Sequence, residues 1–281
     1  MTKTKINDWI TKSAHQISDT SEYPFLEVEV LLASVIEQSR AWLASHPEYE
    51  LENTELDRAN DLFERLAGGE PLPYVTGKQA FYGLDFIVTP DVLIPRPETE
   101  ILVEECIQWL ESNPAKRTMV DIGTGSGIIA VTLADHFEDL QITAIDISEK
   151  ALEVAQNNAS QFHVENQISF LQNNLLENHS RNYHLITANL PYIPTEALQS
   201  LSVAKHEPLL ALDGGADGLD KIKELLNQCG VNIKKGGMII LEIQFDQSVP
   251  VAEMAKRLFP DSNVSIVDDL AKHPRIIKIQ M

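Results

Sequence analysis

The sequence predicts an α/β protein with a doubly wound, parallel sheet that follows a small helical domain. Apolar strands and helices alternate from residue 118 onward, which is typical of a parallel sheet covered by helices on both faces. The first roughly 70 residues have helical periodicity instead. A length of 281 residues favours about two domains, and a hydrophobic fraction of 43% supports a core.

The N-terminal region carries two helical signals. Residues 24–39 present apolar side chains at the i, i+3, i+4, i+7 spacing of an amphipathic helix, namely Val28, Leu31, Leu32 and Val35. Residues 53–69 offer Thr54 as an N-cap and Gly68 as a left-handed C-terminal stop. These helices form either a structural bundle or a platform on which a partner docks, and the sequence leaves both open.

A short β-prone segment joins this region to the alternating part of the chain. Val, Ile and Phe cluster around Gly83 and Pro90, which predicts a hairpin. We therefore expect a helical domain, a hairpin linker and a sheet domain, at residues 1–76, 77–100 and 101–281; the docking role of the first is implied only by the family resemblance given below.

The sheet domain is predicted to contain seven strands. Strand-like runs occupy residues 118–123, 141–146, 167–172, 183–190, 236–245, 263–269 and 275–280. Between them, one helix opens at Gly127, and others cover residues 148–162, 219–229 and 247–258.

Composition limits the class of partner. With 42 acidic and 22 basic residues the net charge is −20, a field that repels a phosphate backbone and suits a basic protein partner in a salt-sensitive encounter. No apolar run reaches 18 residues and the N-terminus lacks an apolar signal segment, so we expect a cytoplasmic protein without a membrane span. Cys106 and Cys229 are expected to be packed thiols of a reducing compartment.

A glycine-rich loop, VDIGTGSGI, follows the first predicted strand of the sheet. A dinucleotide fingerprint would carry a third glycine where Ile128 stands, and the acidic Asp121 beside the loop suits an ammonium group better than a phosphate. This pattern indicates S-adenosylmethionine, with Asp146 at the next strand end accepting hydrogen bonds from ribose hydroxyls. We predict that the cofactor contacts are Asp121, Gly123, Thr124, Gly125, Ser126, Gly127, Asp146, Asn174 and Asn189, with Asn174 near the adenine edge.

The stretch NLPYIP, at residues 189–194, ends the fourth predicted strand and should lie beside the glycine loop. An amide nitrogen is a poor nucleophile, and two acceptors can hold its N–H groups in line with a methyl donor. The Asn189 side-chain oxygen and the Leu190 carbonyl can be those acceptors, while Pro191 stiffens the loop and Tyr192 packs on a planar group. We predict Asn189, Pro191 and Tyr192 as catalytic residues, and the same three with Leu190 as substrate-binding residues.

A long glycine-containing loop, HEPLLALDGGADGLD, follows at residues 206–220. Its adjacent His206 and Glu207 are interpreted as a hydrogen-bonded structural pair rather than as catalytic groups. The eight histidines and two cysteines show no ligand spacing, so we expect no metal site.

Taken together, these segments resemble the HemK/PrmC family of enzymes. The resemblance spans nearly the whole chain and rests on PYVTGKQAFYGLDF, LIPRPETE, DIGTGSG, AIDIS, NLPYIP, HEPLLALDGGADGL and DDLAKHPR, in that order. It implies a class I S-adenosylmethionine-dependent methyltransferase fold, with seven strands of which the last pair antiparallel. It also implies methylation of the side-chain nitrogen, N5, of the glutamine in the GGQ motif of peptide chain release factors, which supports translation termination.

Three positions depart from the family pattern. Leu190 replaces the first proline of N-P-P-Y, which keeps the backbone carbonyl and predicts a looser loop. Asn174 stands where an acid is usual, so the adenine contact is open. Gln244 occupies the place of a glycine after a late strand, with consequences that the sequence leaves open.

Three other functions compete with this reading. An adenine-N6 methyltransferase acting on DNA or RNA could grip an exocyclic amine with the same loop, but the acidic charge disfavours it. A non-enzymatic binding protein with a vestigial site is disfavoured by the intact glycine loop, Asp146 and Asn189. A nicotinamide dehydrogenase is disfavoured by Ile128.

Overall fold

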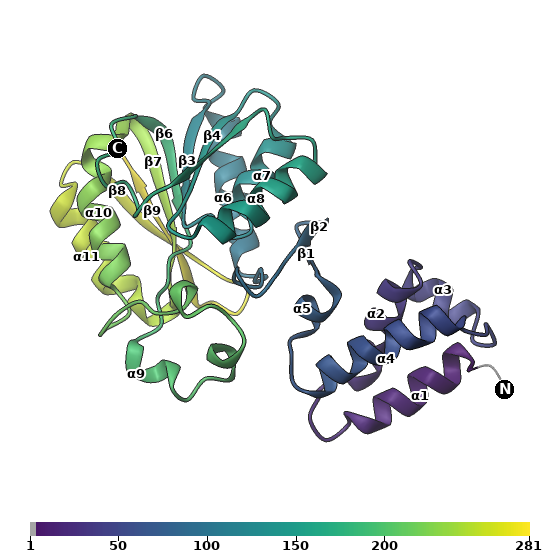
Figure 1. Cartoon of the computed structure of the whole chain (residues 1–281). Coiled ribbons are helices and arrows are strands. Elements are labelled where there is room, and N and C mark those ends of the chain that lie inside the picture. The colour runs from purple at the N-terminus through teal and green to yellow at the C-terminus, as the bar shows by residue number, and fades with distance from the viewer. Residues whose placement is uncertain (1–3) are drawn as a thin grey trace. The chain divides into compact units, whose positions relative to one another are not determined.

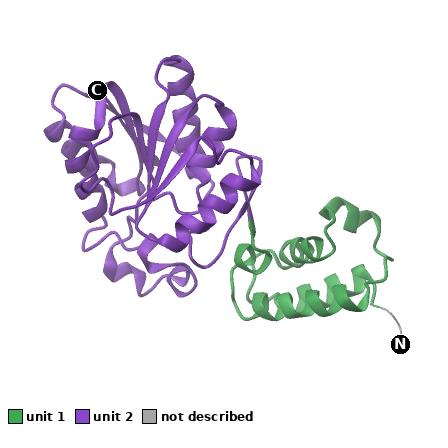
Figure 2. Ribbon diagram, turned by 45° about the horizontal axis from the view of Figure 1, so that its top comes forward, with its two compact units in different colours: residues 1–78 green, residues 79–281 purple. Residues whose placement is uncertain are grey.

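The computed structural model describes residues 4–281, and the chain divides into two compact units (Figures 1 and 2). Unit 1 ends at Lys78 and unit 2 begins at Gln79. Within the described residues, no helix is both long and apolar enough to cross a membrane. The three-part division expected from the sequence stays a prediction.

Unit 1 is helical and has its own hydrophobic core. Its helices are α1 (Ile6–Gln16), α2 (Pro24–Val35), α3 (Arg40–Ser45), α4 (Asn53–Ala67) and α5 (Leu72–Thr76). Helix α2 packs against both α1 and α4. The predicted stripe of Val28, Leu31, Leu32 and Val35 is buried in this core, which confirms the amphipathic assignment.

The predicted N-cap of α4 is two residues too late, and the predicted left-handed glycine is one residue too early. The helix begins at Asn53 with Glu52 as N-cap, because Glu52 and Glu55 form a reciprocal capping box in place of a Thr54 cap. At the other end Gly68 keeps a right-handed φ of −73°, and Gly69 takes the left-handed conformation with φ 92°.

The predicted hairpin is present and belongs to the sheet unit for most of its length. Strands β1 (Lys78–Phe81) and β2 (Leu84–Ile87) turn through Gly83, whose φ of 78° suits glycine. Phe86 is fully buried in a core cluster of unit 2. The hairpin is thereby anchored to the unit that contains the sheet.

The central sheet has seven strands in the order β5-β4-β3-β6-β7-β9-β8. They are β3 (Thr118–Ile122), β4 (Gln141–Asp146), β5 (Ile168–Gln172), β6 (Tyr183–Ala188), β7 (Ile233–Glu242), β8 (Asn263–Asp268) and β9 (Pro274–Gln280). Neighbours pair in parallel except that β9 is antiparallel to both β7 and β8. The doubly wound seven-stranded prediction is confirmed, including its antiparallel end.

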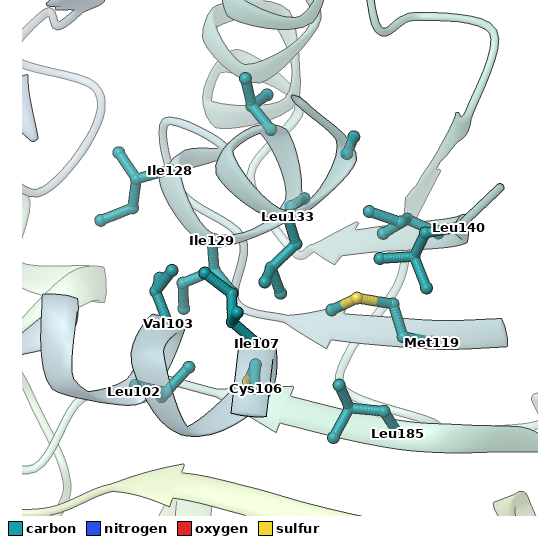
Figure 3. Close-up of a cluster of buried hydrophobic side chains, with 14 of the residues drawn as sticks. Leu102, Val103, Cys106, Ile107, Met119, Ile128, Ile129, Leu133, Leu140 and Leu185 are labelled. Carbon is teal, nitrogen blue, oxygen red and sulfur yellow. The ribbon is translucent and has the colours of Figure 1, made fainter. Parts of the chain in front are cut away.

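Helices cover both faces of this sheet (Figure 1). One face packs against α6 (Thr99–Ser112), α7 (Ile128–His136) and α8 (Glu149–Gln161) in one apolar cluster. Figure 3 shows the part of this cluster that α6 and α7 contribute. The other face packs against α10 (Asp220–Asn232) and α11 (Ser248–Leu258). A short helix, α9 (Thr195–Leu198), and the 3-10 turns Ser202–Lys205, Leu209–Ala211 and Phe245–Gln247 lie in the connections.

The strand order changes direction between β3 and β6, which are parallel neighbours. In open α/β sheets the crevice at such a switch point receives ligands at the carboxyl ends of the strands. The glycine loop leaves β3 and the NLPYIP stretch leaves β6. The fold therefore brings the two predicted loops together at one sheet edge.

Candidate active site

A cavity of about 280 Å³ lies at this edge. Its wall is built by the glycine loop, the end of β4, the segments 90–96, 173–175, 189–191 and 208–211, and the first turn of α10. The volume is close to the lower bound of roughly 300 Å³ that is usual for ligand pockets. Of the predicted site residues, Gly123, Thr124, Gly125, Ser126, Asp146, Asn174, Asn189, Leu190 and Pro191 line it.

The glycine loop has a backbone conformation that side chains resist. Gly123, Gly125 and Gly127 have φ values of 68°, 56° and 82°. A Cβ on Gly127 would come within 3.1 Å of the Ala155 Cβ, and one on Gly123 within 3.1 Å of Leu190 Cδ2. These close approaches hold the loop between α8 on one side and the NLPYIP stretch on the other.

Asp146 is the last residue of β4 and lines the cavity. One oxygen accepts a 2.9 Å hydrogen bond from the Gly125 N–H, and the other accepts one of 2.9 Å from the Ser148 N–H. Burial raises the pKa of this carboxyl, while these backbone bonds partly offset the rise. Each oxygen has a further lone pair, so the group can still accept hydrogen bonds from ligand hydroxyls.

Asp121 lies behind the loop and does not line the cavity. Its oxygens accept hydrogen bonds from Thr124 Oγ1 at 2.7 Å and from Thr187 Oγ1 at 2.9 Å. Burial raises the pKa of Asp121 to about 7 despite these two bonds. The arrangement gives Asp121 a part in shaping the loop, and its direct contact with an ammonium group stays a prediction.

Asn158 is a supporting residue that the sequence analysis did not identify. It is fully buried on α8, donates to the Ser126 carbonyl at 2.8 Å and to the Ile87 carbonyl at 3.0 Å, and accepts from the Ile87 N–H at 2.7 Å. This one side chain fixes the glycine loop to the end of the hairpin. The sequence gives no signal for such a role, because an Asn in an amphipathic helix can equally lie on the exposed face.

Asn174 lines the cavity next to the end of β5, where an adenine contact was expected. Its side-chain nitrogen donates to Glu224 Oε1 at 3.1 Å, and Glu224 Oε2 accepts from Lys221 at 3.0 Å. Lys221 also lines the cavity. Within residues 4–281 the Asn174 side-chain oxygen accepts no hydrogen bond, and its contact with adenine stays a prediction.

The NLPYIP stretch presents two unused acceptors. Asn189 Nδ2 donates to Thr99 Oγ1 of α6 at 3.1 Å, so the amide nitrogen has a partner within the protein. Within residues 4–281, neither Asn189 Oδ1 nor the Leu190 carbonyl accepts a hydrogen bond. Leu190 is buried against the glycine loop, so the residue that departs from the family pattern fills space there.

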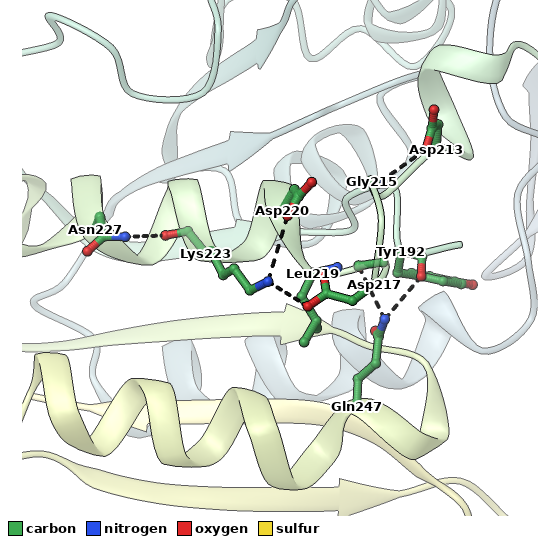
Figure 4. Close-up of polar contacts among 10 residues, drawn as sticks. Tyr192, Asp213, Gly215, Asp217, Leu219, Asp220, Lys223, Asn227 and Gln247 are labelled. Atoms are coloured by element: carbon green, nitrogen blue, oxygen red, sulfur yellow. Dashed lines mark hydrogen bonds and ion pairs between the residues drawn. The ribbon is translucent and has the colours of Figure 1, made fainter. Parts of the chain in front are cut away.

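The segment around Pro191 and Tyr192 packs backbone to backbone against the loop at Gly214–Gly218 (Figure 4). A Cβ on Gly218 would lie 2.3 Å from the Tyr192 carbonyl, and one on Gly214 would lie 2.8 Å from the Pro191 carbonyl. Tyr192 does not line the cavity, and burial raises the pKa of its hydroxyl to about 12. Its predicted packing on a substrate group stays a prediction.

Gln247 holds these two loops together, and the sequence analysis missed it. Its Nε2 donates to the Tyr192 carbonyl at 3.0 Å and to the Gly218 carbonyl at 3.1 Å, while its Oε1 accepts from the Gln244 N–H at 3.1 Å. Gln244 in turn caps the short 3-10 turn that contains Gln247. The predicted strand at residues 236–245 therefore ends at Glu242, because the chain turns into this cap.

Glu207 pairs with Arg96 rather than with its neighbour His206, so the expected structural pair is wrong. The Glu207 side chain is 2% exposed, forms an ion pair with the Arg96 guanidinium, and accepts from the Ile94 N–H at 3.1 Å. His206 is exposed. This pair joins LIPRPETE and the HEP loop beside the cavity, and both are segments on which the family resemblance rests.

Comparison with known families matches both units. Residues 98–206 match the model of the methyltransferase small domain, and residues 8–77 match the model of the PrmC N-terminal domain. Helical unit and sheet unit are thus each similar to a described domain.

Curated relatives match over most of the chain. A release factor glutamine methyltransferase of Koribacter versatilis is 39% identical over 258 residues, and one of Moorella thermoacetica is 40% identical over 256 residues. Each alignment covers 90% of both chains. Among solved structures, the hMettl16 catalytic domain in complex with MAT2A 3'UTR hairpin 6 has a TM-score of 0.55 at 16% identity, covering 81% of this chain and 82% of that one. At this identity the structural likeness concerns the fold alone.

Proposed function

Because this chain belongs to the release factor glutamine methyltransferase family, we propose that it methylates the N5 nitrogen of the GGQ glutamine in peptide chain release factors. The reaction supports translation termination. The observation that carries this proposal is the pair of unused acceptors, Asn189 Oδ1 and the Leu190 carbonyl, at the wall of the cavity.

The cofactor is S-adenosylmethionine, and the donor set of the cavity fits it. Asp146 retains acceptor capacity for two ribose hydroxyls, and the position of a Cβ on Gly125 is open, with no atom within 4 Å. When bound, the cofactor supplies an electrophilic methyl group carried on a sulfonium. We assign its binding to residues 123–127, Asp146 and Asn174, with Asp121 supporting the loop, while Asn189 lines the same cavity and holds the substrate amide.

The residues around Asn189 hold the acceptor nitrogen. Lone-pair delocalisation makes an amide nitrogen weakly nucleophilic, so the rate depends on orientation and on the exclusion of water more than on a strong base. Asn189 Oδ1 and the Leu190 carbonyl accept the two amide N–H groups. Pro191 and Tyr192 keep these acceptors in place through their backbone contacts with the loop at Gly214–Gly218.

Unit 1 is proposed to dock the release factor. Its sequence matches the PrmC N-terminal domain over residues 8–77, and the helices have a core of their own that leaves their outer faces to a partner. The net charge of −20 favours a partner with a basic surface. The buried, unpaired Cys106 and Cys229 fit the cytoplasm, where release factors act.

An adenine-N6 methyltransferase is not favoured. The curated relatives are named for release factor glutamine, and the acidic charge opposes a nucleic-acid backbone.

A radiolabel assay tests the proposal. Purified release factor, a matched release factor whose GGQ glutamine is replaced by alanine, duplex DNA and RNA are each incubated with the enzyme and methyl-labelled S-adenosylmethionine. We expect label only in the unmodified release factor. Label in nucleic acid, or equal label in the alanine variant, would contradict the proposal.

A further inference from the structure

Glu242 is a buried carboxyl group that the proposed reaction does not use. It is the last residue of β7, and its side chain is almost fully buried, with 2% of the residue exposed. Its Oε2 atom is buried and has no hydrogen-bond partner within the described residues. An unsatisfied buried carboxylate oxygen is costly, and such groups concentrate at functional sites.

The sheet register places Glu242 beside the acceptor loop. Ala188 of β6 pairs with Leu241 of β7, so Asn189, which follows β6, lies beside Glu242, the last residue of β7. Thr99, the first residue of α6, approaches both. Its hydroxyl and the Asn189 side chain are hydrogen-bonding neighbours of the Glu242 carboxyl, and Asn189 Nδ2 donates to Thr99 Oγ1 at 3.1 Å.

The polarity of this cluster follows from its chemistry. A carboxylate can only accept hydrogen bonds, so a Thr99 hydroxyl beside it must donate to it. The Thr99 oxygen then accepts, and the group that donates to it must be the nitrogen of the Asn189 amide, as observed. When Glu242 is protonated, its O–H can donate to the Thr99 oxygen, so the Thr99 hydroxyl no longer has to donate to Glu242. The Thr99 hydroxyl can then donate to Asn189 Oδ1, which requires the Asn189 amide to be flipped.

We infer that Glu242 is a positioning residue, which together with Thr99 holds the Asn189 amide so that Oδ1 faces the substrate nitrogen. The kinetic test of this inference rests on the proposed function, because it measures methyl transfer. Glu242 acts through Thr99 and Asn189 and touches neither substrate nor cofactor.

The titration of Glu242 lies in an accessible range. Burial raises the pKa of Glu242 to about 7, the bonds with Thr99 and Asn189 and the charge of Arg275 lower it, and the charge of Glu98 raises it. Glu242 also acts on Tyr192, because burial and the charge of Glu242 raise the pKa of the Tyr192 hydroxyl to about 12. The positioning form of Glu242 is the ionised one, so turnover should fall as the pH decreases through 7.

The test combines kinetics with substitutions that keep the shape of each side chain. The wild type should lose about tenfold in kcat from pH 8 to pH 6, as expected for one group with a pKa near 7. Glu242→Gln should have a lower kcat at pH 8 and a smaller loss of kcat from pH 8 to pH 6 than the wild type, in which Glu242 and Asp121 both have a pKa of about 7. Thr99→Val should lose about tenfold in kcat with cofactor affinity unchanged, while Thr99→Ser, which keeps the hydroxyl, should stay near the wild type. Glu253→Gln, at an exposed site of α11, is the matched control.

A second readout needs no turnover. The side-chain NH₂ resonances of Asn189, assigned by their loss in Asn189→Ala, should shift with a midpoint near pH 7 in the wild type and stay constant in Glu242→Gln. An acidic limb as large in Glu242→Gln as in the wild type, equal kcat in Thr99→Val and Thr99→Ser, or Asn189 resonances that do not shift with pH would each overturn the inference. A wild type that shifts its resonances but transfers no methyl group would contradict the proposed function alone.

Discussion

The Arg96 guanidinium forms an ion pair with Glu207, a carboxylate of which 2% is exposed although the two residues lie 111 positions apart. Arg96 lines the cavity from the segment before α6, and Glu207 precedes the loop at residues 208–211 that forms another part of the wall. The pair therefore ties two walls of the site together. Because Glu207 also accepts from the Ile94 N–H at 3.1 Å, its charge is satisfied by two partners.

Removing the charge of Arg96 should destabilise unit 2. In Arg96→Met the buried Glu207 carboxylate loses its counter-ion, which costs about 3 kcal/mol for a pair of this kind. Urea denaturation followed by circular dichroism measures the loss. The control is Lys150→Met, whose partner Asp91 is 40% exposed, and which should change stability by less than about 1 kcal/mol. If both substitutions lower the free energy of unfolding equally, the buried pair contributes no more to stability than the exposed one.

Replacing Asp146 should weaken cofactor binding. Asp146→Ala removes the acceptor proposed for the ribose hydroxyls and frees the Gly125 N–H. Hydrogen bonds to charged groups contribute about 1.5–3 kcal/mol, so affinity should fall roughly 10- to 100-fold. Calorimetric titration with S-adenosylmethionine measures this, with the exposed Asp139→Asn as control. Unchanged affinity in Asp146→Ala would remove Asp146 from the cofactor site.

A methyl group at Gly218 should impair turnover. In Gly218→Ala the new Cβ would lie 2.3 Å from the Tyr192 carbonyl at a φ of 75°, so the loop that supports Asn189 must move. A displacement of about 1 Å at a reacting group can cost roughly 100-fold in rate. Gly230→Ala in α10 is the matched control, because its nearest neighbour is 3.8 Å away. If both variants turn over alike, the contact between the two loops does not position the site.

Asn189→Ala should abolish most turnover while sparing the cofactor. The variant loses the Oδ1 acceptor proposed for the substrate amide, and we expect kcat to fall by about 100-fold or more. Cofactor affinity, measured by calorimetry, should stay near that of the wild type. Asn227→Ala, an exposed position of α10, controls for the substitution itself. Equal loss of turnover and cofactor affinity would assign Asn189 to the cofactor or to the fold.

Periodicity and strand-end chemistry predicted the sheet domain well. The continuous apolar runs predicted the strands, and the position of the glycine loop and of the NLPYIP stretch after neighbouring strands predicted that they meet. The pairing of Glu207 with Arg96 was missed, since a neighbour in sequence was preferred over a residue far along the chain. The helix Thr99–Ser112 received no assignment, and Thr99 was missed with it.

The supporting residues could not be read from the sequence. Asn158, Gln247 and Glu242 are polar residues whose roles depend on which backbone atoms the tertiary fold brings to them. Local patterns carry no information on such contacts, because an Asn or Gln with the same neighbours in sequence can equally face water. The fold encloses Asp121 behind the glycine loop, where it accepts from Thr124, and its predicted contact with the cofactor stays a prediction.

Tandem mass spectrometry of a purified release factor, after incubation with this protein and S-adenosylmethionine, tests the central claim most directly. The account predicts one added methyl group on the side-chain nitrogen of the GGQ glutamine, present with the wild type and nearly absent with Asn189→Ala. A release factor that stays unmodified while the protein binds the cofactor, or a methyl group on any other residue, would contradict it.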